Sequence, residues 1–323
     1  MIDQKKCSNS LRSLKSSSSH KHFSVMFSEV LKYLKVSPGK IIVDGTVGLG
    51  GHSKGILREL KGHGKLVGFE WDKENFNFAQ NYLKEFPNCE LNLENFSNLE
   101  KTLSFHGIKN IDGILLDLGL SSVHLDNPKR GFSFRFNEKL DMRMNLNQEF
   151  SAVDVLQKFS AKELRDIFWK FGEEKLSKKI ADRIVESREN GEIIDSGEKL
   201  LEVISNITRN PKKTAARIFQ ALRIEVNSEL ENLEKVLPQA VNLLSTGGRI
   251  VIISFHSLED RIVKKFFKKM ENPCLCPKSL PCVCGKKPVL KIVSKKPVLP
   301  SEDEILKNSR SRSAKMRVAE KIL

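Results

Sequence analysis

Apolar runs and amphipathic segments alternate over the first 120 residues of the chain. Short runs at 40–44, 65–70, 89–93 and 113–120 each have the length and composition of a buried strand. The segments between them carry apolar residues three or four positions apart, which is the spacing of one helix face. Strands that alternate with helices predict an α/β fold with a parallel sheet, in which ligands bind beyond the carboxyl ends of the strands.

The pattern becomes purely helical from about 141 to 211. Ser151 and Ser160 each stand three residues before an acid, as in the capping boxes that open helices. Apolar residues then recur at the spacing of a helix face, for example at Leu164 and Phe168. We therefore expect an all-helical insertion over 141–211.

The strand pattern returns after one long helix, which is expected over 215–244. The run at 248–255 predicts a fifth buried strand, and the segments 288–294 and 314–321 are expected to form a final antiparallel pair. The expected organisation is a sheet domain over 23–140 and 212–323, the helical insertion over 141–211, and a disordered, basic, serine-rich tail over 1–22.

A glycine-rich stretch, IIVDGTVGLGGHSK at 41–54, begins in the first predicted strand. A dinucleotide-binding fingerprint started at Gly48 would need a third glycine where Ser53 stands, and a phosphate-binding P-loop would need lysine and a hydroxyl where Gly51 and His52 stand. The order of strand, acid and glycines still lets backbone N–H groups and a helix N-terminus approach a ligand without phosphates. S-adenosylmethionine is such a ligand, and the alternative is a tight turn that binds nothing.

Polar or aromatic side chains follow the next three predicted strands. Glu70 lies about twenty residues past the loop, where a carboxylate can accept hydrogen bonds from both ribose hydroxyls. Phe96 follows the third strand, where its ring can cover adenine, and Asp117 ends the fourth strand, where the reactive end of the ligand is expected. An ionised Asp117 can face an amino group or a sulfonium. The respective alternatives are an exposed loop acid, a core phenylalanine and a helix cap.

The net charge of +15 is concentrated at the two ends of the chain. Residues 1–22 carry five lysine or arginine residues and one acid, and 261–323 carry seventeen against five, so the middle is close to neutral. The final stretch, NSRSRSAKMRVAEKIL, suits a polyanion such as RNA, since each neutralised phosphate releases counterions. The alternative is a basic surface that only aids solubility.

Hydropathy and the basic tail bear on localisation. No window approaches the roughly 18 to 20 apolar residues of a membrane span, and the tail lacks the apolar core of a secretory signal. We expect a cytoplasmic protein that does not enter a membrane, with a mitochondrial transit segment as the weaker alternative.

Four of the six cysteines lie in one short stretch, PCLCPKSLPCVCG, as Cys274, Cys276, Cys282 and Cys284. Four thiolates this close can hold one tetrahedral zinc ion. The C-x-C pairs differ from the usual C-x2-C knuckle, however, and the flanking prolines indicate a rigid surface loop. The sequence therefore leaves zinc open in this loop, favours disulfides less because nothing marks the chain as exported, and predicts no metal in the ligand site itself.

Ordered motifs along the chain resemble those of one family. They are DGTVGLGGHS, GILLDLGLSS, RGFSF, LDMRMN, FQALRIEVNSELE and ISFHSLEDRIVK, together with the ending SRSAKMRVAEK. Over about residues 22–321 the chain resembles the bacterial cytidine-N4 methyltransferases of small-subunit (16S) ribosomal RNA. The resemblance implies a Rossmann-like methyltransferase fold with a helical substrate-recognition insertion, S-adenosylmethionine as methyl donor, and a decoding-centre cytidine as acceptor.

The resemblance also implies which residues contact the cofactor, with two departures. The family commonly has aspartate where Glu70 stands, and a Pro-Gln pair where Val123 and His124 stand. Glutamate moves the carboxylate one methylene outward, and histidine offers one hydrogen bond unless both ring nitrogens take part. The implied cofactor contacts are Gly50, Gly51, His52, Glu70, Phe96, Asp117 and His124.

The implied reaction is in-line transfer of a methyl group to the exocyclic amine of cytosine, for which positioning dominates. Asp117 is the best candidate for a catalytic residue, although the sequence identifies no base. Arg130, Arg135 and Arg143 are candidates for contacts with RNA phosphates, and the alternative is that they pair with local acids such as Asp126.

The expected partner is small-subunit ribosomal RNA within the assembled small subunit, and the chain is expected to act as a monomer or homodimer. One rival is a ribosome-assembly factor that keeps the fold without catalysing transfer. A DNA amino-methyltransferase is a second rival, but that class usually carries a D/N/S-P-P-aromatic tetrad where this chain reads DLGL. A nicotinamide oxidoreductase is the third, already disfavoured by the glycine spacing.

Overall fold

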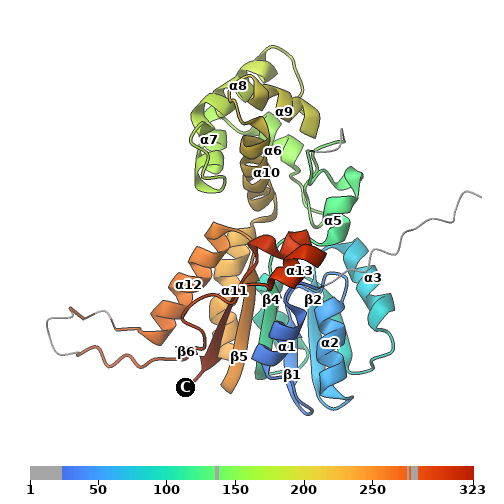
Figure 1. Cartoon of the computed structure of the whole chain (residues 1–323), viewed down its shortest axis with the longest axis vertical. Coiled ribbons are helices and arrows are strands. Elements are labelled where there is room, and N and C mark those ends of the chain that lie inside the picture. Colours follow the sequence, from blue (N-terminus) through green and yellow to red (C-terminus); the bar gives the residue numbers. More distant parts are fainter. Residues whose placement is uncertain (1–23, 135–137, 275, 278–282) are drawn as a thin grey trace, which may run out of the picture.

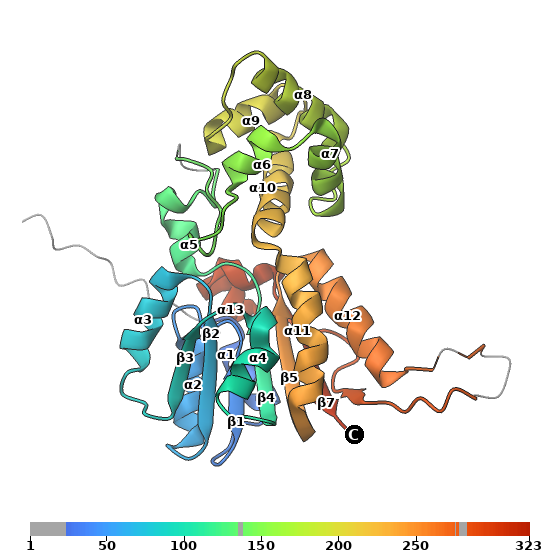
Figure 2. The ribbon, with the colours of Figure 1, turned by 180° about the vertical axis from the view of Figure 1, so that it is seen from behind.

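The computed structural model describes residues 24–134, 138–274, 276–277 and 283–323. Its centre is a seven-stranded sheet in the order β3-β2-β1-β4-β5-β7-β6, seen from two sides in Figure 1 and Figure 2. Strands β1 to β5 are parallel, and β7 runs antiparallel to β5 and β6. The strands are β1 (Ile41–Asp44), β2 (Lys65–Glu70), β3 (Cys89–Leu93), β4 (Ile111–Asp117), β5 (Leu244–Ser254), β6 (Leu290–Ile292) and β7 (Lys315–Lys321).

The sheet confirms the predicted α/β fold, the fifth strand and the final antiparallel pair. Strand β5 begins earlier than predicted, at Leu244, so that Gly247 and Gly248 lie inside the strand and not at a helix end. Gly247 has a φ of 83°, and the pairing of β5 with β4 shifts register at this point. Glycine accommodates an irregularity in a strand as readily as it ends a helix. These two glycines therefore mark an irregularity within β5.

Helices cover both faces of the sheet. On one face, α1, α2 and α3 pack over an apolar core that includes Val30, Ile56 and Leu83. On the other, α4, α11 and α12 enclose a second core around Leu103, Leu237 and similar residues. These helices are α1 (Phe27–Leu34), α2 (Gly51–Leu60), α3 (Lys73–Leu83), α4 (Leu99–Phe105), α11 (Glu229–Leu243) and α12 (Ser257–Glu271).

Five further helices form a separate layer above the sheet in Figure 1. Two of them begin at the predicted capping boxes of Ser151 and Ser160. Their shared core also takes in Phe132 and Leu140 on one side and the buried face of α10 on the other. We therefore propose that the helical domain extends over about 131–227. Its helices are α6 (Ala152–Lys158), α7 (Ala161–Lys170), α8 (Ser177–Glu189), α9 (Gly197–Ser205) and α10 (Pro211–Asn227).

The prediction of a single long helix over 215–244 is wrong. The chain breaks at Ser228, which has left-handed backbone angles (φ 50°, ψ 37°), and this residue separates α10 from α11. The Asn227 side chain holds the break, because it donates to the Met142 carbonyl (2.7 Å) and accepts from the Met144 N–H (2.8 Å). The junction of the helical domain with the sheet domain is thus fixed by a side chain.

The C-terminal segment crosses the region between the two domains before it enters the sheet as β7. It forms α13 (Glu302–Lys307) and a short 3-10 helix, η3 (Ser309–Ser313). Other short elements are α5 (Ser122–Asp126), η1 (Phe96–Asn98) and η2 (Pro128–Arg130). In the described part of the chain, none of the helices combines the length and apolarity needed to cross a bilayer.

Candidate active site

A cavity of about 590 Å³ lies at the carboxyl ends of the parallel strands. It is lined on the sheet side by the glycine loop and the residues that follow β2, β3 and β4. It is lined on the opposite side by the junction of α10 with α11 and by residues 307–310 of the C-terminal segment. The predicted ligand residues that line it are Gly51, His52, Glu70, Phe96, Asp117 and His124.

The glycine loop shapes the end of this cavity next to α2. Gly51 lines the cavity as the first residue of that helix, and a Cβ there would overlap the Ser24 hydroxyl. Gly50 is the N-cap with a φ of 84° and does not line the cavity, because a Cβ there would face Tyr82 and Leu83. Gly50 therefore supports the loop, and Gly51 presents the N-terminus of α2 to a ligand.

Asp44, at the end of β1, was not assigned from the sequence, yet it anchors the loop. Its carboxylate accepts hydrogen bonds from the Ser53 hydroxyl (2.6 Å) and the Thr46 N–H (3.1 Å). Burial raises the pKa of Asp44 to about 6, and these two hydrogen bonds oppose that rise. The Thr46 hydroxyl oxygen in turn accepts from the Asp117 N–H at 2.6 Å, which ties β1 to the end of β4.

Glu70 ends β2 and places its carboxylate across the glycine loop. One oxygen accepts from the Gly48 N–H and the other from the Asp72 N–H, both at 2.8 Å. Burial raises the pKa of Glu70 to about 7, the neighbouring Asp72 charge adds to the rise, and the backbone hydrogen bonds oppose it. Each carboxylate oxygen keeps a further lone pair, so Glu70 can still accept from ligand hydroxyls.

Asp117 ends β4 beside the deepest part of the loop. Its Oδ2 lies 3.5 Å from His52 Nδ1, whereas its Oδ1 is buried and, among the described residues, has no hydrogen-bond partner. Burial raises the pKa of Asp117 well above its ordinary value, and the nearby Asp44 and Glu259 charges raise it further. A cationic group in the cavity would satisfy this carboxylate, because it would supply both the missing donor and the missing positive charge.

His52 and Phe96 complete the sheet side of the cavity. The Nε2 of His52 lies 2.9 Å from the Val25 carbonyl, and its ring stacks on Phe27, so the imidazole is fixed beside Asp117. Phe96 opens η1 after β3 and also packs against the sheet core. Phe96 thus lines the cavity and packs against the core at the same time, and its contact with adenine stays a prediction.

His124 lines the cavity, but both of its ring nitrogens are used within the protein. Nε2 lies 3.0 Å from the Asp72 carboxylate, and Nδ1 accepts from the Ser121 N–H at 3.3 Å. This pair of contacts fits a neutral ring protonated at Nε2. A ligand is left with the edge or face of the ring, so the hydrogen bond implied by the family resemblance is not available from His124 in this arrangement.

The RNA-phosphate role expected for Arg130 conflicts with its position. Arg130 is buried, pairs with Asp72 at 2.5 Å, and donates to the carbonyls of Arg143 and Met144. Burial would raise the pKa of Asp72, but hydrogen bonds from His124 and Arg130 outweigh it and hold that pKa below its usual range. Arg130 is therefore a structural cation that joins the sheet domain to the segment leading into the helical domain.

Arg143 also pairs with a local acid, as the alternative prediction for these arginines states. Its guanidinium makes two hydrogen bonds to the Asp141 carboxylate, both at 2.8 Å, and one to the Gln148 carbonyl at 2.7 Å. Neither it nor Arg130 lines the cavity. Arg135, the third candidate, lies outside the described residues.

Several cavity residues were missed because they come from distant parts of the chain. Arg223 of α10 makes a two-pronged ion pair with Glu229 of α11, at 2.7 and 2.9 Å. Asn227 and Glu259 also line the cavity, and Lys307 reaches it from the C-terminal segment. Polar residues within an amphipathic helix look like solvent-facing positions in the sequence, and only the break at Ser228 turns them toward the strand ends.

Known proteins resemble this chain over almost its full length. Residues 19–322 match the model of the MraW methylase family. A ribosomal RNA small subunit methyltransferase H from Caldicellulosiruptor saccharolyticus is 48% identical over 307 residues, which is 94% of this chain and 100% of that protein. The protein of the same name from Carboxydothermus hydrogenoformans is 45% identical over 306 residues, covering 93% and 98%. That from Clostridium botulinum strain Loch Maree is 47% identical over 307 residues, covering 94% and 99%.

Proposed function

Because this chain belongs to the MraW methylase family, we propose that it transfers a methyl group from S-adenosylmethionine to the exocyclic N4 amine of a cytidine in small-subunit ribosomal RNA. The observation that carries the proposal is the Asp117 carboxylate on the cavity wall, whose buried Oδ1 has no hydrogen-bond partner among the described residues. A carboxylate in this state, at a strand end and on a cavity wall, calls for a cationic ligand.

The residues present fit the methyl donor. When bound, the donor supplies an activated methyl group on a positively charged sulfur. Gly51 and the N-terminus of α2 leave room for a ligand at the loop, Glu70 is placed to accept from ribose hydroxyls, and Phe96 can cover the adenine. Asp117 would hold the cationic end of the ligand, with His52 fixing the orientation of the carboxylate.

The acceptor would enter from the side of the helical domain. The loop 118–121 after β4 lines the cavity and offers backbone carbonyls, which together with Asp117 can hold the N4 hydrogens of a cytosine. Arg223 and Asn227 face the same space from the helical side. A base can reach it only when unstacked, so the target is a single-stranded or flipped-out cytidine.

The phosphate contacts assigned to Arg130 and Arg143 are better supplied by the C-terminal segment. Lys307 and Arg310 line the cavity and are exposed, and Arg312 is exposed on the same short segment. Arg310 pairs with Asp126 at 2.5 Å, so Lys307 and Arg312 form the basic rim that we propose contacts RNA at the entrance.

Labelled S-adenosylmethionine, offered to the protein with small ribosomal subunits from cells that lack it, tests the proposal. We expect label in N4-methylcytidine after nucleoside analysis, and none in subunits from cells that contain the protein. Naked ribosomal RNA in a parallel reaction shows whether the assembled subunit is needed. The rival, an assembly factor without turnover, predicts subunit binding without label in any nucleoside, and label in another nucleoside would overturn the cytidine assignment.

A further inference from the structure

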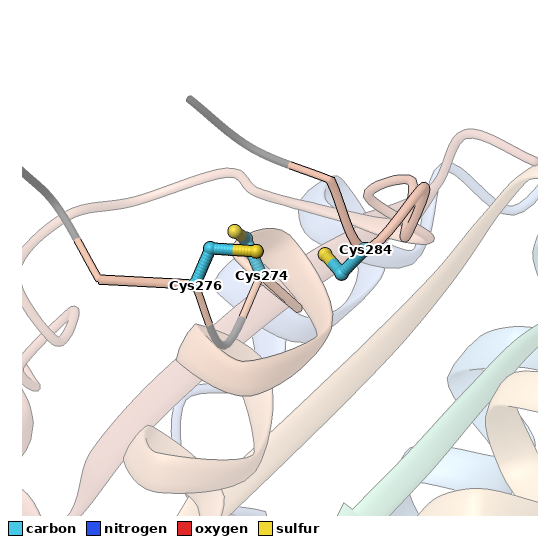
Figure 3. Close-up of side chains that lie close together, drawn as sticks. All are labelled: Cys274, Cys276 and Cys284. Atoms are coloured by element: carbon cyan, nitrogen blue, oxygen red, sulfur yellow. The ribbon is translucent and has the colours of Figure 1, made fainter. Parts of the chain in front are cut away.

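Three cysteine side chains meet in the connection between α12 and β6, far from the cavity (Figure 3). The sulfur atoms of Cys274, Cys276 and Cys284 all lie within 4.8 Å of one another. Cys274 and Cys276 are two positions apart, and residues so spaced in an extended chain point to the same side. Cys284 approaches them from the part of the connection that leads to β6.

The connection that carries these cysteines contributes little to the cores of the protein. The connection runs from 272 to 289, and none of its described residues is buried or belongs to a helix or strand. Val283, next to Cys284, is 89% exposed. A connection of this length whose described residues form no helix or strand is uncommon unless something orders it, and among those residues only Val289 packs against an apolar core. Cysteine is usually a buried residue, whereas Cys274 is exposed and Cys276 and Cys284 are half-buried, so thiols brought together here suggest a chemical role.

Charge and backbone geometry both favour a metal. The connection carries Lys278, Lys286 and Lys287 and no acid, so its net charge of +3 can offset the negative charge of thiolates around a dication. Gly285 follows Cys284 with a φ of 62°, which lets the chain turn sharply directly after that sulfur. Prolines on both sides of the first cysteine pair restrict the unfolded loop and reduce the entropy lost on ordering.

We propose that Cys274, Cys276 and Cys284 bind one structural zinc ion, a site separate from and independent of the proposed methyl transfer. In a tetrahedral zinc site with Zn–S bonds of about 2.3 Å, neighbouring sulfurs lie about 3.8 Å apart, so the observed cluster needs only a small contraction. Soft thiolate ligands select zinc over magnesium or calcium. Zinc binding would displace the thiol protons and form three Zn–S bonds, with no change in oxidation state.

The sequence offers a fourth thiol within the same motif, Cys282, which lies outside the described residues. The proposal rests on the three cysteines that the structure brings together. A zinc ion there would fasten the two ends of the connection to each other. It would thereby order a basic projection beside α12, because the free energy of metal binding becomes free energy of folding for a segment with no core.

Metal content of the full-length protein, purified without chelator, is the direct test. We expect about one zinc per chain in the wild type and less than about a tenth of that in Cys274→Ser/Cys276→Ser. Cys89→Ser is the matched control, because Cys89 lies on β3 away from the cluster and its loss should leave the zinc content unchanged. Exchange with Co²⁺ should give the intense visible bands of a tetrahedral thiolate site in the wild type and in the control only.

Three further readouts separate a structural zinc from a catalytic one. Removal of zinc by a chelator should speed protease cleavage within 272–289 by about tenfold, while the thermal midpoint and the single-turnover methylation rate stay unchanged. Wild-type protein with less than about a tenth of a zinc per chain and no Co²⁺ bands would overturn the proposal, as would zinc retained by the double variant. A disulfide within the cluster, found by peptide mapping of protein purified without reductant, would also overturn it.

Discussion

Replacement of Asp117 by asparagine should reduce methyl transfer without weakening the fold. The substitution keeps the size of the side chain and removes the charge that we propose faces the cationic donor. A lost charge-assisted contact costs about 1.5 to 3 kcal/mol, which corresponds to roughly a ten- to hundred-fold fall in donor affinity or single-turnover rate. Asp166→Asn on α7 is the control, because it removes an exposed carboxylate outside the cavity.

The same substitution should raise the stability of the ligand-free protein at high pH, although it lowers the activity. Burial raises the pKa of Asp117, so between the ordinary value of 3.8 and the raised value the folded protein binds more protons than the unfolded chain. The ligand-free wild type therefore loses stability as the pH rises through that window. Asparagine does not titrate, so the thermal midpoint of Asp117→Asn relative to the wild type should increase as the pH rises above about 4.

Single-turnover rates and thermal midpoints measured on one preparation at several pH values test both the activity and the stability predicted for this variant. A variant that is less stable than the wild type at high pH but fully active per folded molecule would refute the reasoning, because Asp117 would then be a structural acid. Wild-type donor affinity in Asp117→Asn would refute it equally. Loss of activity with unchanged or improved stability is the result that a ligand-binding carboxylate predicts.

Three more predictions follow from the cavity and its supports. Glu70→Gln should weaken donor binding roughly tenfold, and the affinity of the wild type, measured by calorimetry, should increase as the pH rises through about 7 while Glu70 ionises; an equally steep increase in Glu70→Gln would exclude Glu70 as the cause. Lys307→Ala and Arg312→Ala should each lower RNA affinity and reduce the log–log salt slope by about one per lost phosphate contact, whereas unchanged slopes would mean that the rim does not touch RNA. Arg130→Ala should lower the unfolding free energy by about 3 to 5 kcal/mol, because it removes the guanidinium that pairs with the buried Asp72 carboxylate and leaves His124 and backbone N–H groups to stabilise that charge; denaturant titration checks this, and a stable variant with weakened RNA binding would restore the phosphate role.

The order of strands and helices could be predicted from the sequence because each element has a strong local pattern. Strands β1, β2 and β4 are short apolar runs and β3 alternates apolar with polar residues, and the acids or aromatics that follow them mark the sheet edge where ligands bind. The sequence alone therefore predicts one shared site for Glu70, Phe96 and Asp117, and in the structure all three line one cavity. Local pattern and sheet topology together suffice for residues that stand at strand ends.

Residues whose role depends on distant partners could not be assigned in this way. Arg130 looks like a surface cation in the sequence, but it is buried against Asp72, which lies more than fifty positions earlier. Ser228 breaks a helix inside a continuous amphipathic pattern, because the bonds that hold the break come from residues near Met142. The sequence likewise predicts that 314–321 pairs with 288–294, but not that this strand, β7, also pairs with β5 inside the sheet.

The three carboxylates at the ends of β1, β2 and β4 show how the structure ranks residues that the sequence treats alike. Both oxygens of Asp44 are engaged within the loop, by Ser53 and by the backbone. Both oxygens of Glu70 accept from backbone N–H groups, each with a lone pair to spare. Asp117 alone of the three has an oxygen without a partner among the described residues. A buried carboxylate oxygen without a hydrogen bond is costly, so we propose that a ligand supplies the partner that Asp117 lacks.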